Sequence, residues 1–152
     1  MSIPYFIIIP VIVVAITQTI KFILKSYDKD TKEMEPNWRY LDDYGGMPSS
    51  HTAFMMSLLT IVLLHDGLNT ITAAITTIIT IVIIRDALGY RMYLQRHAEV
   101  LNKLIKRLPA EDHKNYPQHL EETVGHTIWE ILVGGALGIS ISILLWYLLN
   151  LG

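Results

Sequence analysis

The chain has 152 residues, enough for one domain, and 51% of them are hydrophobic while only 17% are charged. Twelve basic and fourteen acidic side chains nearly balance, so the charge gives no indication of nucleic-acid binding. The absence of cysteine excludes disulfides, thiol catalysis and thiolate metal sites. Several apolar runs approach the ~20 residues that a helix needs to cross a bilayer, which predicts an integral membrane protein.

Four apolar runs predict four transmembrane helices. Their expected bounds, in chain order, are about 3–24, 50–65, 68–88 and 124–149. The first run has no basic residue before it and no small-residue cleavage site after it, so we expect it to stay in the protein as a span. The fold class is therefore an all-α polytopic bundle, a multi-pass protein of the cell membrane.

Two polar stretches, about 25–48 and 89–122, lie between the first and second spans and between the third and fourth. In the later stretch, apolar residues recur at helical spacing from Tyr90 to Leu108, which predicts one amphipathic helix on the membrane surface. All twelve Lys and Arg residues lie in these two stretches or at their flanks. The positive-inside rule then predicts that both stretches are cytoplasmic and that the N- and C-termini are outside.

A glycine-rich turn leads into the second span. Residues 45–51 read Gly-Gly-Met-Pro-Ser-Ser-His, and Gly46 and the proline favour a tight turn. Ser49 or Ser50 can cap the helix that follows, whose first N–H groups are otherwise unpaired. Such a helix start favours an anion, and His51 in the first turn can exchange a proton with it. The alternative is an ordinary capped helix with a histidine at the interface.

Other polar residues cluster at helix ends on the same predicted membrane face. They are Gln18 and Lys21 after the first span, Arg85, Asp86 and Arg91 after the third, and Glu122, His126 and Glu130 at the start of the last. The last three recur at every fourth position, which predicts that they share one helical face. Lys21 alternatively extends to the interface as a snorkelling lysine. Convergent cations, histidines and a helix N-terminus together indicate a phosphate site.

Small residues in the last span predict close helix packing. Gly134 and Gly138 have the small-xxx-small spacing that lets two membrane helices approach each other.

These motifs resemble a divergent branch of the type 2 phosphatidic acid phosphatase and vanadium haloperoxidase superfamily, the acid phosphatase/vanadium-dependent haloperoxidase related membrane proteins. The similarity covers nearly the whole chain. It lies in Gln-x-x-Lys at 18–21, Gly-Gly-Met-Pro-Ser-Ser-His at 45–51, Asp-Ala-x-Gly-x-Arg at 86–91, Asn102, and Gly-His-x-x-x-Glu at 125–130. Pro-Ser-Ser-His also looks like the Pro-Ser-Gly-His motif of the wider superfamily.

The resemblance implies a phosphatase that works through two histidines. One superfamily histidine, in an Arg-x5-His-x3-Asp motif, attacks phosphorus, and the Pro-Ser-Gly-His histidine protonates the leaving group. Carried over, His126 is the nucleophile, Glu130 its orienting carboxylate and His51 the general acid. The sequence departs from the pattern at Leu120, which stands where the motif has arginine, so Arg85 or Arg91 would supply that charge. The superfamily core also has more helices than the four expected here, so a homodimer is one way to complete the site.

Three hypotheses follow. The first is a phosphatase that hydrolyses a lipid phosphate monoester at the cytoplasmic face through a phosphohistidine, without a cofactor and with membrane lipids as its partners. Its phosphate would be held by Lys21, Arg91, Ser49, Ser50, Gly46, Arg85 and Gln18. The second is a metal-dependent lipid phosphatase that binds Mg²⁺ or Mn²⁺ through Asp86, Glu122, His126 and Glu130. The third is a non-enzymatic membrane subunit that binds a lipid head group or a partner protein.

Overall fold

A computed structural model describes residues 5–27, 46–109, 116–117, 120, 122 and 125–150, without the side chains of 25–27 and 150. These residues form helices and no strand, which confirms the predicted all-α class. The helices are α1 (Tyr5–Tyr27), α2 (Ser50–Asp66), α3 (Ile71–Leu88), α4 (Tyr90–Ile105) and α5 (Ile128–Asn150). Most of the polar stretch expected at 25–48 lies outside the described residues, as does Gly45.

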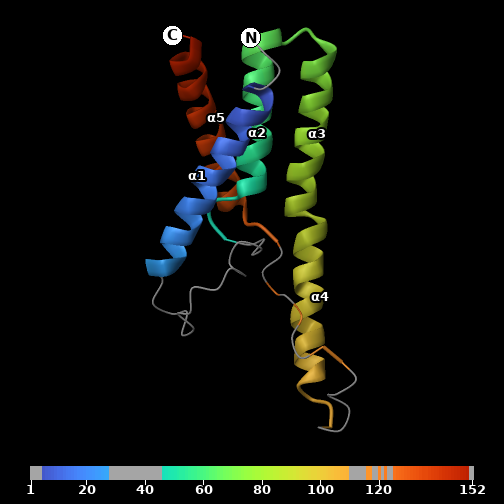
Figure 1. The fold of residues 1–152 in the computed structure, drawn as a ribbon. Coiled ribbons are helices and arrows are strands. Elements are labelled where there is room, and N and C mark those ends of the chain that lie inside the picture. Colours follow the sequence, from blue (N-terminus) through green and yellow to red (C-terminus); the bar gives the residue numbers. More distant parts are fainter. Residues whose placement is uncertain are drawn as a thin grey trace.

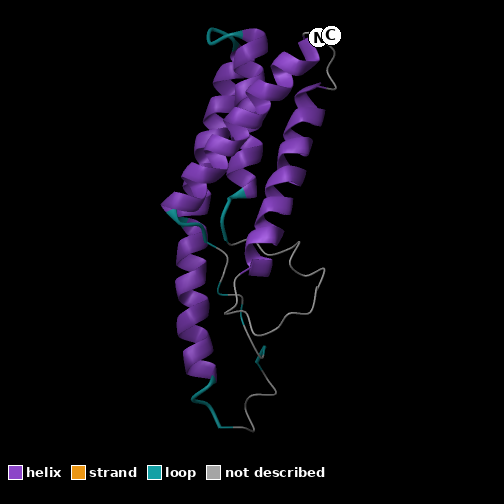
Figure 2. Ribbon diagram, turned by 90° about the vertical axis from the view of Figure 1, so that its left-hand side faces the viewer, coloured by secondary structure: helices purple, strands orange, loops and turns teal. Residues whose placement is uncertain are grey.

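The helices confirm a membrane protein, with α2 in the middle of the bundle. Three stretches are long and apolar enough to cross a membrane: Tyr5–Leu24, Ile71–Ile105 and Ile128–Leu149. The remaining expected span, α2, has 17 residues and packs against α1, α3 and α5. The start of α1 and the end of α5 lie at one end of the bundle (Figures 1 and 2). The end of α1 and the starts of α2 and α5 therefore face the opposite way, as expected for the predicted topology.

The fourth helix, α4, follows α3 after the single residue Gly89. The N–H of Gly89 is 2.8 Å from the carbonyl oxygen of Arg85, so the helical hydrogen bonding of α3 carries on to this residue. The predicted amphipathic pattern is present, with Leu94 and Leu101 exposed and Asn102 buried. However, α4 continues in the direction of α3 beyond the ends of the other helices and does not turn across the bundle (Figures 1 and 2).

A seam of small residues joins α2 to α5. The facing pairs, one helical turn apart, are Gly134 with Ser49, Gly138 with Ala53, and Ser142 with Ser57. A Cβ atom on Gly134 or Gly138 would overlap the backbone carbonyl of its partner, which confirms the predicted close approach. Ser142 and Ser57 complete the seam with a buried hydrogen bond of 2.6 Å between their hydroxyls. Because residue numbers rise together on both helices, α2 and α5 run parallel.

A buried stripe on α1 ends at Lys21. Ile9, Val13 and Thr17 are fully buried at every fourth position, and Lys21 continues the stripe with 4% of its surface exposed. The hydroxyl of Thr17 donates to the carbonyl of Val13 at 2.9 Å, so its polarity is satisfied within the helix. The bundle therefore encloses Lys21, whereas a snorkelling lysine would extend to the surface.

Candidate active site

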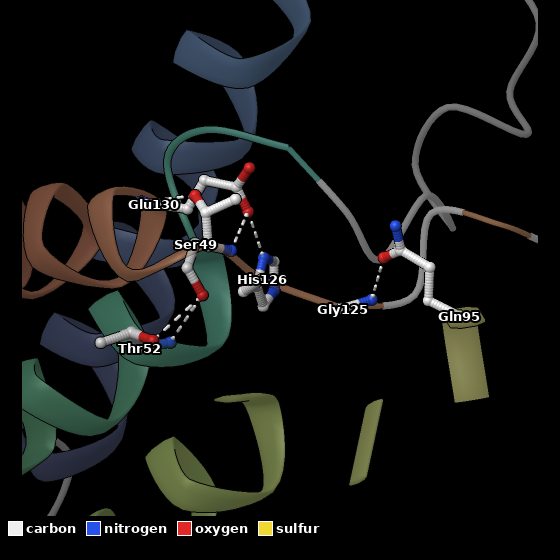
Figure 3. Close-up of polar contacts among 7 residues, drawn as sticks. Ser49, Thr52, Gln95, Gly125, His126 and Glu130 are labelled. Carbon is white, nitrogen blue, oxygen red and sulfur yellow. Dashed lines mark hydrogen bonds and ion pairs between the residues drawn. The ribbon is translucent and has the colours of Figure 1, made fainter. Parts of the chain in front are cut away.

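His126 is buried immediately before α5, with 1% of its surface exposed. Its Nδ1 atom lies 2.9 Å from Oε2 of Glu130 (Figure 3). An ionised carboxylate can only accept a hydrogen bond, so Nδ1 carries the proton and donates it. The lone pair then resides on Nε2, which is buried and has no hydrogen-bond partner in the described part of the chain. An imidazole oriented by a carboxylate through its other nitrogen is the arrangement that a nucleophilic histidine requires.

The start of α5 is fixed by a capping box. The N–H of Glu130 donates to the hydroxyl of Thr127 at 3.3 Å, and the N–H of Thr127 donates to the carboxylate of Glu130 at 3.2 Å. The helix consequently begins at Ile128, so the prediction that Glu122, His126 and Glu130 share one helical face is wrong. The Thr-x-x-Glu pattern at 127–130 is itself a sequence signal for this helix start, and it is more specific than hydropathy.

The start of α2 is attached to the first turn of α5. Ser49 is the N-cap of α2, and its hydroxyl oxygen accepts a hydrogen bond from the N–H of Thr52 at 3.4 Å. The N–H of Ser49 itself donates to the backbone carbonyl of Glu130 at 3.1 Å. Gly46, with a φ of 97°, makes the turn that precedes this cap, a conformation that favours glycine. The capped start of α2 is thus held beside the His126–Glu130 pair.

Two further polar side chains, Ser50 and His51, lie in the first turn of α2. The ring centroids of His51 and His126 are 6.5 Å apart, so the two histidines predicted to act on one phosphate lie close together. Ser50 is buried, and its hydroxyl oxygen has no hydrogen-bond partner among the described residues. Buried polar atoms normally have partners, so Ser50 Oγ and His126 Nε2, both unpartnered among the described residues, are candidate groups for hydrogen bonds to a ligand.

Positive charge from two further helices reaches this site. Lys21 of α1 and Arg91 of α4 both act electrostatically on His51. Arg91 is held in place by Asp86, whose Oδ2 accepts a hydrogen bond from its Nε at 3.1 Å. Two cations near a helix N-terminus form a favourable environment for an anion with several charged oxygens, such as a phosphate.

The other predicted site residues are Gln18, Arg85 and Glu122, which lie in three different parts of the fold. Gln18 is half-buried one turn before Lys21, and Arg85 is exposed in the last turn of α3. Glu122 does not join the site, because its carboxylate accepts a hydrogen bond from Asn102 far along α4, at 2.6 Å. Within the described ranges, no three His, Asp or Glu side chains are placed to hold a metal ion. Of the predicted metal ligands, only His126 and Glu130 pair with each other among the described residues, whereas Asp86 pairs with Arg91 and Glu122 with Asn102.

Comparison with known proteins agrees with these observations. The sequence pattern of the divergent PAP2 family matches residues 4–141. The chain belongs to the divergent PAP2 family. It is 33% identical over 121 residues to the uncharacterized membrane protein YuiD of Bacillus subtilis (strain 168), covering 73% of this chain and 77% of that protein. No solved structure matches the chain.

In this divergent PAP2 protein, alanine substitutions at two adjacent serines should affect different properties. Ser49→Ala removes the cap of α2 and should lower the free energy of unfolding by about 1 kcal/mol. Ser50→Ala removes an unpartnered hydroxyl, so stability should change by less than about 0.5 kcal/mol, while affinity for inorganic phosphate falls about five- to tenfold. Thermal unfolding and phosphate titration in detergent measure both quantities. Equal stability losses, or unchanged phosphate affinity in Ser50→Ala, would contradict the assignment.

Proposed function

We propose that the chain is a membrane phosphatase that removes phosphate from a lipid phosphate monoester, with His126 as the nucleophile. The observation that carries this proposal is the buried Nε2 atom of His126, unpartnered among described residues while Nδ1 is fixed on Glu130. A histidine that serves only packing would normally have both ring nitrogens satisfied. Membership of the divergent PAP2 family supports a phosphatase-related role.

In the first proposed step, the Nε2 lone pair of His126 attacks phosphorus and the bond from phosphorus to the lipid oxygen breaks. Protonated His51 gives its proton to that oxygen, so the lipid leaves as an alcohol. Glu130 retains the hydrogen bond to Nδ1 and stabilises the positive charge that develops on the ring. Lys21, Arg91 and the N-terminus of α2 would bind the three equatorial oxygens, on which negative charge accumulates.

In the second step, a water molecule attacks the phosphohistidine and the phosphorus–nitrogen bond breaks. Neutral His51 takes a proton from that water, which restores its protonated form. Inorganic phosphate leaves, and the lone pair returns to Nε2 of His126. One copy of the chain supplies every group in these steps, so the mechanism does not require the homodimer considered from the sequence.

Exposed apolar side chains next to the site support a lipid substrate. Ile128 and Trp129, the first two residues of α5, are two and three positions after His126 and have 64% and 72% of their surfaces exposed. A substrate whose phosphate reaches His126 can therefore keep its hydrocarbon chains beside α5, in the bilayer. We propose that this end of the bundle faces the cytoplasm, since all twelve basic residues belong to the segments on this side.

The direct test is phosphate release from a panel of lipid phosphate monoesters by the purified protein in detergent, with and without a chelator. The two-histidine mechanism predicts that the rate of phosphate release is the same with and without the chelator. Release that the chelator abolishes and Mg²⁺ or Mn²⁺ restores would favour metal-dependent catalysis. Binding of lipid phosphates without any release would favour the non-enzymatic subunit.

The proposed orientation has a separate test, because the chain lacks cysteine and a single introduced cysteine is a unique label. Leu68→Cys lies in the turn between α2 and α3, where the native side chain is 80% exposed, and Lys106→Cys lies at the end of α4. In intact cells, a membrane-impermeant maleimide should label Leu68→Cys but label Lys106→Cys only after permeabilisation. The reverse pattern would show that the site faces outward.

A further inference from the structure

Most of α4 has no direct part in the proposed mechanism. Only Arg91, in its first turn, acts on the site, and the rest of the helix extends beyond the bundle (Figure 1). Two of its residues are nevertheless buried, namely Ala98 and Asn102. Asn102 and Gln95, two turns earlier, form hydrogen bonds to Leu120, Glu122 and Gly125, which lie before α5 in the sequence.

Both the nitrogen and the oxygen of the Asn102 side-chain amide form hydrogen bonds to residues before α5. Its Nδ2 donates to the carbonyl of Leu120 at 2.8 Å and to the carboxylate of Glu122 at 2.6 Å. Its Oδ1 accepts a hydrogen bond from the N–H of Leu120 at 2.9 Å. A single buried side chain thus pairs both backbone groups of one residue, which fixes the position of the chain along α4. Removing the amide would leave those backbone groups without partners.

A second attachment lies nearer the site. The Oε1 atom of Gln95 accepts a hydrogen bond from the N–H of Gly125 at 3.3 Å (Figure 3). Gly125 lies so close to α4 that an added Cβ would overlap the side chain of Met92. The next residue, His126, donates its N–H to the carbonyl of Ala87, at the end of α3, at 3.4 Å. These contacts hold His126 where its ring can reach the site.

As the chain runs from Leu120 to His126, its partners run backwards along the sequence, from Asn102 through Gln95 to Ala87. We infer that Asn102 and Gln95 are positioning residues, which hold the chain before α5 against α4 and thereby place Nε2 of His126. The distance along the helices from Asn102 to Ala87 is roughly 20 Å at about 1.5 Å per residue, so Asn102 acts through the backbone and does not touch the substrate. The inference rests on the proposed role of His126 as nucleophile.

The first test is the steady-state kinetics of Asn102→Ala, with Lys103→Ala as control because Lys103 is the exposed neighbour on the same helix. Asn102→Ala should lower kcat for lipid phosphate hydrolysis about 10- to 100-fold, since small displacements of reacting groups have effects of this size. KM should stay within about twofold, because the residues proposed to bind phosphate are unchanged. Lys103→Ala should resemble the wild type. A rise in KM at constant kcat, or no change at all, would overturn the inference.

The second test does not depend on activity. Spin labels at Leu94→Cys on α4 and Ile128→Cys at the start of α5 report the distance between α4 and the residues beside His126, and both native side chains are exposed. Asn102→Ala should broaden the distance distribution, and Lys103→Ala should not. An unchanged distribution in Asn102→Ala would overturn the inference even if activity fell. If the wild type releases no phosphate but Asn102→Ala broadens the distribution, the proposed function fails while the positioning role is supported.

Discussion

Replacing Glu130 with glutamine should lower kcat by about 10²- to 10⁴-fold without unfolding the protein. A glutamine oxygen in the place of Oε2 can still accept from Nδ1 of His126, but it carries no negative charge to stabilise the imidazolium that forms in the proposed attack. The hydrogen bond to the N–H of Thr127 survives, because glutamine also serves in a capping box. His126→Ala removes the attacking atom itself and should lower kcat by about 10⁴-fold or more.

Thermal unfolding of both variants in detergent separates catalysis from stability. Glu130→Gln should melt within a few degrees of the wild type, whereas its rate of phosphate release should be strongly reduced. His51→Ala provides a further comparison, because it keeps the nucleophile and should still form a covalent phosphoenzyme that can be trapped by rapid denaturation. The trapped species should be absent in His126→Ala. Retention of more than about a hundredth of wild-type activity in His126→Ala would place the nucleophile elsewhere.

The second large effect is expected in the seam between α2 and α5. Gly134→Ala and Gly138→Ala place a methyl group against the backbone of Ser49 and Ala53, and backbone in a packed helix cannot move aside. Each substitution should destabilise the protein by about 1–3 kcal/mol. Gly134→Ala should also reduce activity, because Ser49 caps the helix end that we propose binds phosphate.

Gly135→Ala is the matched control for this prediction. A Cβ at Gly135 would meet only the side chains of Met56 and Thr52, at 3.5 and 3.7 Å, which are ordinary contact distances. Because alanine favours a helix over glycine by about 1 kcal/mol, Gly135→Ala should be neutral or slightly stabilising. Melting temperatures of the three variants in one detergent measure the difference. If all three variants melted alike, the seam would not be the close contact described here.

The sequence predicts the parts of the site that depend on local chemistry. The serine cap of α2 and the small-residue contact at Gly134 and Gly138 each follow from neighbouring residues. Their physical basis is short-range, namely an unpaired helix N–H and a missing Cβ. The pairing of His126 with Glu130 is implied by the family resemblance and not by helical spacing, because His126 lies before the start of α5. The convergence of the helix ends also follows, because alternating spans return the polar connections to one side of the bundle.

Other features could not be predicted because they depend on distant partners or on weak hydropathy signals. Hydropathy suggested a last span from about residue 124, but the capping box at Thr127 starts the helix at Ile128. That difference removes Glu122 from the face of α5, and Asp86 pairs with Arg91, so the predicted metal ligands do not come together in the described part of the chain. The partner of Asn102 is the backbone of a residue 18 positions away, which no periodicity in the sequence reveals.

The parallel seam also has a consequence for biosynthesis. Because a chain is synthesised from its N-terminus, α2 emerges well before α5. The surface formed by Ser49, Ala53 and Ser57 therefore has no partner helix until α5 has been synthesised. The proposed nucleophile is completed by that same partner, since α5 carries Glu130, which pairs with His126. A nascent chain that ends before Ile128 therefore contains Lys21, Arg91 and the capped start of α2 but lacks the carboxylate that orients His126. The insertion of α5 both completes the bundle and fixes His126 beside the start of α2.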